Sequence, residues 1–332
     1  MPRPLSVALL GFWHVHAGDY ARSVLAHPDT ELVAAWDPDA DRGRAGAAEF
    51  DVPFEADLDA LLARDDLDAV VVTTSTDQHP DVLMRAAAAG KHIFTEKLLA
   101  GTVAEAESIL HEAERRDVKV VVSLPRLAEP IPLAVKRILD GGSLGDITYT
   151  RVRLAHDGWA HDWLPERFGN RAEALGGALA DLGCHPAYLT QLFLGSHPST
   201  VSASYTASSG RAVEDNAVVT TTYPSGALGV FEASFVTTPG AFSIEVRGTE
   251  GSLLHGFGND DLRAKGTAFP GNDWSVVDEP EAAPEPFAVW VDAIRTGTVA
   301  TENLRAAVEL TRLVAAANES AEQGVVVRYP AP

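Results

Sequence analysis

Two short groups of residues carry side chains that could perform acid–base chemistry. Glu96 and Lys97 directly follow the stretch 91–95, which is a strand candidate. Asp181 and His185 are four residues apart, a spacing that places side chains on one face of a helix. An aspartate beside a histidine can orient the imidazole and stabilise its charged form, as a general acid or base requires. The structural alternatives are a solvated ion pair for the first group and a hydrogen-bonded histidine near a helix end for the second.

The loop after the first predicted strand is a third candidate site. The run SVALLGFWHVHAG (6–18) contains an apolar strand that ends at Gly11, where dinucleotide-binding folds place a G-x-G-x-x-G turn. Only the first glycine is present, because Trp13 and His16 stand near the places of the other two. Backbone N–H groups at a helix start hold most of a pyrophosphate, so we expect weaker or displaced cofactor binding without loss of the fold.

The H-x-H sequence in this loop also permits a metal hypothesis. His14 and His16 alternate on one strand face, and His79, His156 and His161 could complete a divalent-cation site. The protein would then be a metal-dependent hydrolase with a (β/α)₈ barrel. Such a barrel does not predict the hairpin-rich second half of this sequence, and we therefore expect no metal.

Composition limits the classes of partner. The chain has 332 residues, of which 46% are hydrophobic, enough for a large core and for two domains. Its formal net charge of −21 argues against nucleic-acid and membrane partners. A single cysteine excludes an internal disulfide and a multi-cysteine zinc site, and it fits a reducing compartment. We find no convincing signal peptide or membrane span and expect a cytoplasmic protein.

Strand-like and helix-like stretches alternate through the first part of the chain. The strand candidates after the first are 31–36, 68–74, 91–95 and 118–124, and alanine-rich helical stretches separate them. Thr102 and Glu105 have the spacing of a capping box at one helix start. This rhythm predicts an α/β domain over residues 1–122, a Rossmann-type doubly wound parallel sheet.

The pattern changes after residue 122. A predicted helix at 132–142 precedes several strand-like runs between 146 and 255, with a hairpin signature at 224–226. A proline-rich stretch then leads into two terminal helices. We expect residues 123–332 to form an α+β domain with a large, mostly antiparallel sheet, which binds substrate and mediates oligomerisation.

Taken together, these stretches resemble the glucose-fructose oxidoreductase, inositol dehydrogenase and MocA family of NAD(P)-dependent dehydrogenases. AGKHIFTEK is similar to the family's A-G-K-H-V-x-x-E-K-P, and GGALADLGCH to its G-G-G-x-x-x-D-x-G-x-H. RGTEGSL and FAVWVDAIRTGT are similar to a later strand pair and a late helix of the family. The resemblance covers nearly the whole chain and implies a catalytic group of Lys97, Asp181 and His185.

The resemblance also implies a set of binding residues. Those expected at the cofactor are Gly11, Phe12, Trp13, His14, Asp37, Thr74, Ser75, His79, Glu96 and Lys97. Arg126 lies in a partial match to an arginine-rich strand of the family, and we assign it to the substrate. The segment 155–170 adds Trp159 and His161, whose side chains suit stacking on a ring and bonding to hydroxyls, unless the segment is a packed loop or an oligomer contact.

Asp37 bears on the choice of cofactor. It ends the second predicted strand about two dozen residues after Gly11, where dinucleotide-binding folds place the carboxylate that accepts the ribose hydroxyls. Its charge would repel a 2′-phosphate, so we expect NAD, with NADP possible if Arg42 or Arg44 folds back. We expect both arginines to face solvent. Alternatively, Asp37 only caps the turn that follows it.

The resemblance implies reversible oxidation of a secondary alcohol on a sugar, cyclitol or related polyol, with hydride transfer to the cofactor. It also implies a homodimer or a homotetramer. Leu98 replaces the family's proline after the lysine, and we expect a trans peptide there. Besides the metal-dependent hydrolase, the alternative is a catalytically silent cofactor-binding homologue.

Overall fold

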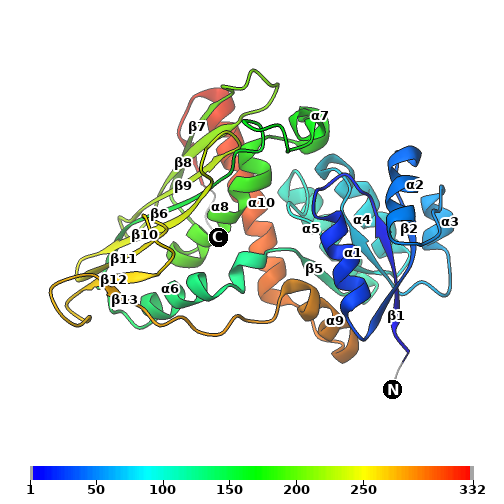
Figure 1. Ribbon diagram of the computed structural model, residues 1–332, viewed down its shortest axis with the longest axis horizontal. Helices are drawn as coiled ribbons and strands as arrows, with labels where there is room; N and C mark the ends of the chain where they lie inside the picture. Colours follow the sequence, from blue (N-terminus) through cyan, green and yellow to red (C-terminus); the bar gives the residue numbers. More distant parts are fainter. Residues whose placement is uncertain (1–2, 330–332) are drawn as a thin grey trace. The chain divides into compact units, whose positions relative to one another are not determined.

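A computed structural model describes residues 3–329, which form two compact units (Figure 1). Unit 1 consists of the chain up to Leu124 together with residues 284–311, and unit 2 consists of residues 125–283 together with the chain from Arg312 onward. The first boundary falls close to the predicted one. The second differs from the prediction, because residues 284–311 return to the N-terminal unit.

Unit 1 contains a five-stranded parallel sheet with the order β2-β1-β3-β4-β5. Its strands are β1 (Leu5–Leu10), β2 (Thr30–Trp36), β3 (Ala69–Val72), β4 (His92–Thr95) and β5 (Val120–Val122). Its helices are α1 (Ala17–Ala26), α2 (Ala40–Glu49), α3 (Leu58–Leu62), η1 (Thr76–Gln78), α4 (His79–Ala88), α5 (Val103–Arg115), α9 (Pro286–Thr296) and the first part of α10 (Thr301–Gln323). The strand order reverses direction between β1 and β3, as in a doubly wound sheet, which confirms the predicted fold class.

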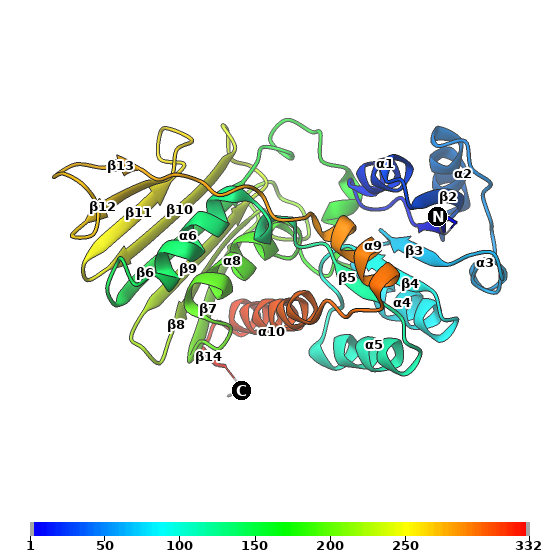
Figure 2. The same ribbon diagram turned by 90° about the horizontal axis from the view of Figure 1, so that it is seen from below.

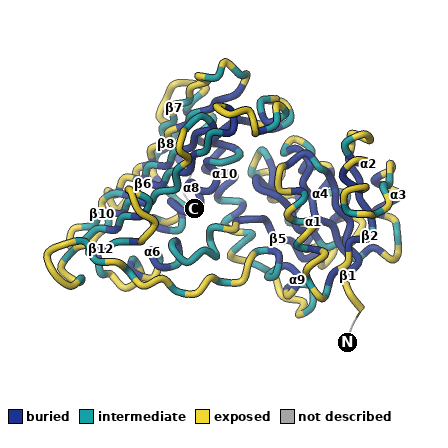
Figure 3. The backbone as a smooth tube through the Cα atoms, in the orientation of Figure 1, coloured by how far each residue is buried: buried dark blue, intermediate teal, exposed yellow. Residues whose placement is uncertain are grey.

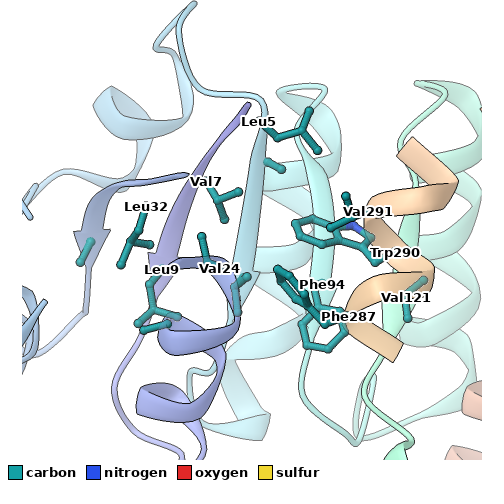
Figure 4. Close-up of a cluster of buried hydrophobic side chains, with 14 of the residues drawn as sticks. Leu5, Val7, Leu9, Val24, Leu32, Phe94, Val121, Phe287, Trp290 and Val291 are labelled. Carbon is teal, nitrogen blue, oxygen red and sulfur yellow. The ribbon is translucent and has the colours of Figure 1, made fainter. Parts of the chain in front are cut away.

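A buried apolar cluster between the sheet, α1 and α9 forms much of the core of unit 1 (Figures 3 and 4). Phe287 and Trp290 of α9 pack against Phe94 of β4, with ring centroids 5.5 and 5.8 Å from it. The Trp290 side chain is fully buried, and its Nε1 donates to the Lys119 carbonyl at 3.3 Å. Truncating such a side chain costs about 3–5 kcal/mol, so α9 is an integral part of this core.

Unit 2 is built on a mixed sheet. Within the described residues this sheet has nine strands, in the order β13-β12-β11-β10-β6-β9-β8-β7-β14, and only the pair β6–β9 is parallel. The strands are β6 (Ile147–Ala155), β7 (Thr200–Thr206), β8 (Asn216–Thr222), β9 (Leu228–Ser234), β10 (Ala241–Gly248), β11 (Gly251–His255), β12 (Arg263–Gly266), β13 (Ser275–Val276) and β14 (Val327–Arg328). The predicted large, mostly antiparallel sheet is confirmed, including the hairpin between β8 and β9.

Helices pack on one face of this sheet (Figure 2). Besides the end of α10, the helices of unit 2 are η2 (Pro125–Leu127), α6 (Pro130–Asp140), η3 (Glu166–Gly169), α7 (Arg171–Ala174), η4 (Leu179–Gly183) and α8 (Cys184–Leu194). Of these, η3 and α7 contact each other, and α6 packs against α8. The helix α8 contacts β6 and β9 at the centre of the sheet, and η4 contacts β9. The central strands therefore support the segment that carries Asp181 and His185. No helix among residues 3–329 has the length and apolar character needed to span a membrane.

Candidate active site

Gly11 lies at the switch point of the parallel sheet, where open α/β sheets bind ligands. Its φ is +96°, and a Cβ atom there would lie 2.7 Å from the backbone nitrogen of Thr74. The Thr73 hydroxyl donates to the Gly11 carbonyl at 2.5 Å, and the His14 N–H donates to the Thr73 carbonyl at 3.1 Å. The loop after β1 is thus attached to the end of β3, and its first residue has to be glycine.

The rest of this loop is occupied by large side chains. The Phe12 ring packs against Gly46 of α2, where an added Cβ would approach a ring carbon to 2.4 Å, and Trp13 is buried. The N-cap position of α1, His16, makes no side-chain cap hydrogen bond. A helix N-terminus of this kind can present backbone N–H groups to a phosphate even without the two missing glycines.

Asp37 lies at the end of β2, and both oxygens of its carboxylate accept hydrogen bonds. One carboxylate oxygen accepts from the Phe12 N–H at 2.6 Å, and the other accepts from the Asp39 N–H at 2.8 Å. Arg42 adds two bonds, of 2.9 and 2.7 Å. The expectation that Arg42 faces solvent was therefore wrong, because a bidentate pair with the buried carboxylate holds it. Arg44 instead lies over the Phe54 ring, with its guanidinium carbon 4.9 Å from the centroid.

Glu96 and Lys97 follow β4 directly and are both buried. The Tyr20 hydroxyl donates to Glu96 Oε1 at 2.5 Å and lies 2.7 Å from Ser123 Oγ, while the Lys97 N–H donates to Glu96 Oε2 at 2.9 Å. Burial alone would raise the pKa of Glu96. Electrostatic interactions with His14, Lys97 and His16, together with the hydrogen bond from the Tyr20 hydroxyl, outweigh burial and lower this pKa to about 2. Glu96 is therefore a fixed negative charge at neutral pH.

The His14 imidazole lies between Lys97 and Glu96. Its Nε2 is 3.4 Å from Lys97 Nζ, and its Nδ1 is 3.7 Å from Glu96 Oε1. The Lys97 ammonium is also 3.7 Å from Glu96 Oε2. A buried positive charge at the carboxyl end of β4 can thus be held by one carboxylate and one imidazole.

The metal hypothesis is not supported by this arrangement. Among the described residues, the only group of three potential ligands whose ligand atoms all lie within 4.8 Å of one another is His14, His16 and Glu96. The Lys97 ammonium already places a positive charge against His14, and it would repel a divalent cation. His79 is bound elsewhere, with Nδ1 2.7 Å from the Leu98 carbonyl. The sheet is open, which also excludes the barrel of that hypothesis.

The peptide between Lys97 and Leu98 is cis, so the expectation of a trans peptide was wrong. The general preference of non-proline residues for trans is overridden at this buried turn, where His79 bonds to the Leu98 carbonyl. Burial lowers the pKa of His79, although the Leu98 carbonyl opposes this shift, so the ring donates from Nδ1 as the neutral form.

Two buried polar atoms near the switch point fit a cofactor. Thr74 Oγ1 and His79 Nε2 have no hydrogen-bond partner among the described residues, and Ser75 is buried at the start of η1. Buried polar groups are normally satisfied. Unpaired groups beside the Gly11 turn are the kind that a bound dinucleotide can satisfy.

In unit 2, the segment with Asp181 and His185 is not one regular helix. A π-helical turn, η4, contains Asp181, and α8 begins at Cys184, with Pro186 in its first turn. Asp181 and His185 thus belong to two successive helical segments and not to one regular α-helix. His185 Nδ1 lies 2.8 Å from the Tyr188 hydroxyl.

Tyr188 connects this histidine to the predicted substrate residue Arg126. The Tyr188 hydroxyl accepts from the Arg126 backbone N–H at 3.2 Å. The Arg126 guanidinium donates to Glu129 at 2.9 Å and lies over the Phe242 ring, 4.2 Å from its centroid. This cation–π contact with the Phe242 ring can fix the orientation of the Arg126 guanidinium.

The segment 155–170 contains one buried and one exposed candidate. Trp159 is 4% exposed, and its ring packs against Phe235 and the Arg211 guanidinium, at 4.8 and 4.7 Å. His161 is exposed and lies 3.2 Å from Asp157. Of the two predicted residues, only His161 offers a polar group on the surface of unit 2.

Four side-chain contacts of the candidate site were not predicted from the sequence. They are the contacts of Tyr20 with Glu96, of His14 with Lys97, of Arg42 with Asp37, and of Tyr188 with His185. Only the last had a local signal, since residues three apart on a helix are neighbours.

Comparison with known proteins agrees with this geometry. Residues 5–124 match an oxidoreductase family described as having an NAD-binding Rossmann fold, and residues 133–254 match the GFO/IDH/MocA C-terminal domain. The chain is 29% identical over 277 residues to scyllo-inositol 2-dehydrogenase (NAD(+)) of Bacillus subtilis (strain 168), covering 80% of this chain and 77% of the relative. It is 28% identical over 320 residues to D-apiose dehydrogenase of Paraburkholderia graminis, covering 90% and 82%.

The matched region is shorter for some curated relatives, and for a dTDP-sugar 3-reductase of Streptomyces violaceoruber it spans 56% of the length of the relative. Among solved structures, GenD2 from gentamicin A biosynthesis, in complex with NAD, superposes with a TM-score of 0.82 at 26% identity and covers 100% of this chain and 98% of its own. The resemblance inferred from sequence motifs is confirmed. The chain therefore belongs to the GFO/IDH/MocA family of oxidoreductases, with its NAD-binding Rossmann domain at residues 5–124.

Proposed function

We propose that the protein catalyses the reversible NAD-linked oxidation of a secondary alcohol on a sugar, a cyclitol or a related polyol. The observation that carries this proposal is the buried Lys97 ammonium, held by Glu96 and His14 at the carboxyl end of β4 in an NAD-binding fold. Relatives with 28–29% identity act on inositol and apiose, by their names. A silent homologue would have no need of a buried cation at this place.

The cofactor would be held by residues of unit 1 that border the switch point. They are Gly11, Phe12, Trp13, His14, Asp37, Thr74, Ser75, His79, Glu96 and Lys97. NAD, when bound, accepts a hydride from the alcohol carbon. The chain itself has to orient the alcohol and move its proton.

We assign the proton chemistry to Lys97, Asp181 and His185. Lys97 donates a hydrogen bond to the alcohol oxygen and favours its alkoxide character. His185 takes the hydroxyl proton on Nε2, which requires that Nδ1–H donates to the Tyr188 hydroxyl, 2.8 Å away. Asp181 positions the substrate or the imidazole. Its charge also acts on His156, where it opposes the lowering of the pKa of His156 by burial.

Arg126, Trp159 and His161 remain our candidates for substrate binding. Trp159 is buried, so we assign it a structural role in the loop. His161 is exposed and is therefore the residue to test first. If His161→Ala leaves the Michaelis constant unchanged, the loop has no part in substrate binding.

The reaction is tested by screening sugars and cyclitols for reduction of NAD by the purified protein, followed by the absorbance of the reduced nicotinamide. On a substrate so identified, Lys97→Met and His185→Ala should each lower kcat by about 10²- to 10⁴-fold. Lys136→Met and His111→Asn change exposed or partly exposed residues outside the proposed site and serve as controls. Full activity of both site variants would refute the assignment.

We further propose that the protein is cytoplasmic and forms a homodimer or a homotetramer. The lone Cys184, which is buried and free, fits a reducing compartment. The homodimer or homotetramer is what the resemblance to the family implies. Light scattering of the purified protein measures the mass directly, and a monomer would exclude this assembly.

A further inference from the structure

Glu214 lies two residues before β8 and is bound to the start of the segment that carries Asp181. Its Oε1 accepts hydrogen bonds from the N–H groups of Gly177 and Leu179, at 2.8 and 3.1 Å. Its backbone carbonyl accepts from the N–H group of Ala178, at 2.9 Å. A single residue therefore holds three successive N–H groups just ahead of Asp181.

This contact is buried and closely packed. Glu214 is 5% exposed, and Gly177 and Leu179 are buried as well. A Cβ atom on Gly177 would lie 2.1 Å from the Glu214 carbonyl oxygen, so this approach requires a glycine. Because water is excluded, withdrawal of the carboxyl group would leave two buried N–H groups without their acceptor.

Glu214 connects this segment to the sheet of unit 2. The neighbouring Asp215 donates its N–H to the last residue of β7 and accepts, at its carbonyl, from the first residue after β9, both at 2.9 Å. At the other end of the contact, the Asp181 N–H donates to the Gly177 carbonyl at 3.1 Å. The place of Asp181 thus depends, through Gly177, on a side chain that adjoins the strands.

We propose that Glu214 is a positioning residue that sets the place of Asp181 at the reacting centre. It acts through the N–H groups of Gly177 and Leu179 and needs no contact with the substrate. The catalytic part of this proposal rests on the proposed function, whereas the attachment of the segment to Glu214 does not. His185 lies further along the chain, in α8, so Asp181 is the group that Glu214 should affect most.

The contact requires the reach of the Glu214 side chain and not its charge. Burial raises the pKa of Glu214, and the N–H groups of Gly177 and Leu179 oppose this shift. An ionised carboxylate, a protonated carboxyl group and an amide all offer an oxygen that accepts hydrogen bonds. Glutamine can therefore replace Glu214, whereas aspartate keeps the charge and withdraws the oxygen by one methylene group.

The activity test compares these two replacements on a substrate found by the screen. Glu214→Gln should keep kcat within about threefold of the wild type. Glu214→Asp should lower kcat by about 10- to 100-fold, as a displacement of about 1 Å at a reacting centre does. The Kd of NADH should change less than about threefold in both variants, because the residues proposed for the cofactor lie in unit 1.

A second buried carboxylate provides the control. Asp215 is fully buried and accepts from the N–H groups of Ser208 and Ser209, away from the Asp181 segment. Asp215→Asn should keep kcat within about threefold, even if it lowers the temperature of unfolding as much as Glu214→Asp does. Thermal unfolding verifies that each variant is folded at the assay temperature.

The effect of Glu214 should also depend on Asp181. In an Asp181→Ala background, Glu214→Asp should lower kcat by less than about threefold, because the side chain that Glu214 positions is already absent. A general structural role of Glu214 would produce the same fold loss in both backgrounds.

Three results would overturn the proposal. Wild-type kcat in Glu214→Asp would show that Asp181 needs no such attachment. Equal losses in Glu214→Gln and Glu214→Asp would show that the contact does not act through reach. An undiminished loss in the Asp181→Ala background would show that Glu214 acts independently of Asp181. Full activity of Lys97→Met and His185→Ala, in contrast, would refute the proposed function.

The attachment itself is tested without any substrate, by hydrogen–deuterium exchange of the peptide that spans residues 176–182. We expect the Gly177 and Leu179 amides to be equally protected in the wild type and in Glu214→Gln. In Glu214→Asp they should exchange at least about tenfold faster, because their acceptor has been withdrawn. The same exchange rates in all three proteins would refute the attachment, whatever reaction the protein catalyses.

Discussion

Replacing Arg42 with methionine should sharpen the discrimination between NAD and NADP. The two oxygens of the Asp37 carboxylate accept four hydrogen bonds, two of them from Arg42. A carboxylate has about four acceptor positions, so the ribose hydroxyls of adenosine can reach Asp37 only where Arg42 gives way. Arg42 also neutralises the charge that would repel a 2′-phosphate. Without Arg42, the Asp37 carboxylate can accept hydrogen bonds from the ribose hydroxyls. Its negative charge is then no longer neutralised by the guanidinium.

The size of the effect can be calculated from Coulomb's law. Two unit charges 4 to 5 Å apart, at an effective dielectric constant of about 20, interact by about 4 kcal/mol. Solvent reduces this figure, since 27% of the Arg42 side chain is exposed. If a third of this interaction energy remains, it amounts to about 1.4 kcal/mol. The ratio of the dissociation constants of NADPH and NADH then rises about tenfold.

Fluorescence titration of both reduced cofactors measures this ratio in three proteins. They are the wild type, Arg42→Met and the control Arg44→Met, which removes an arginine that stacks on Phe54 and has no bond to Asp37. We expect the ratio to rise in Arg42→Met alone. An unchanged ratio, or the same change in both variants, would refute the assignment of Asp37 and Arg42 to the ribose site.

Three further predictions concern stability and catalysis. The pKa of Glu96 in the folded protein, about 2, lies below its ordinary 4.5, so its ionised form stabilises the fold above that value and the contribution is lost as the pH falls towards 2. Urea midpoints of Glu96→Gln should accordingly vary less over this range than those of the wild type. Gly11→Ala should lower the free energy of unfolding by about 2 kcal/mol or more, because of its φ of +96° and a backbone nitrogen 2.7 Å from the new Cβ. Gly90→Ala, with a φ of +74° and open space, should cost only about 1 kcal/mol, and equal urea midpoints would contradict the steric argument. Tyr188→Phe should reduce kcat about tenfold or more by releasing His185, with the Kd of NADH unchanged; an unaltered kcat would remove Tyr188 from the mechanism.

The sheet of unit 1 and the place of its ligand edge could be predicted because their signals are local. The run 68–74 is short and rich in β-branched residues, a helical stretch separates it from 91–95, and both became strands of the parallel sheet. The capping box of Thr102 and Glu105 is likewise present as predicted. Since parallel strands end at one edge, the location of Lys97 followed from the strand before it.

The partners of these residues could not be predicted, because they come from distant parts of the chain. His14 and Lys97 are 83 residues apart, and Tyr20 and Glu96 are 76 apart. Arg42 is near Asp37 in sequence, but the sequence does not show whether its side chain points to solvent or to the carboxylate. In the structure the guanidinium binds the buried Asp37 carboxylate instead of water. The π turn at Leu179–Gly183 also has no pattern in the sequence that separates it from an ordinary helix.

The contribution of α9 to the core of unit 1 affects how the protein is made. A ribosome delivers residues 1–124 long before Phe287 and Trp290, the side chains that cover Phe94. Until then the nascent N-terminal segment leaves an apolar face open to water, and it has to wait through the synthesis of residues 125–283 of unit 2. We therefore expect residues 1–124 expressed alone to expose the same apolar face, unlike a fragment that also includes residues 284–311.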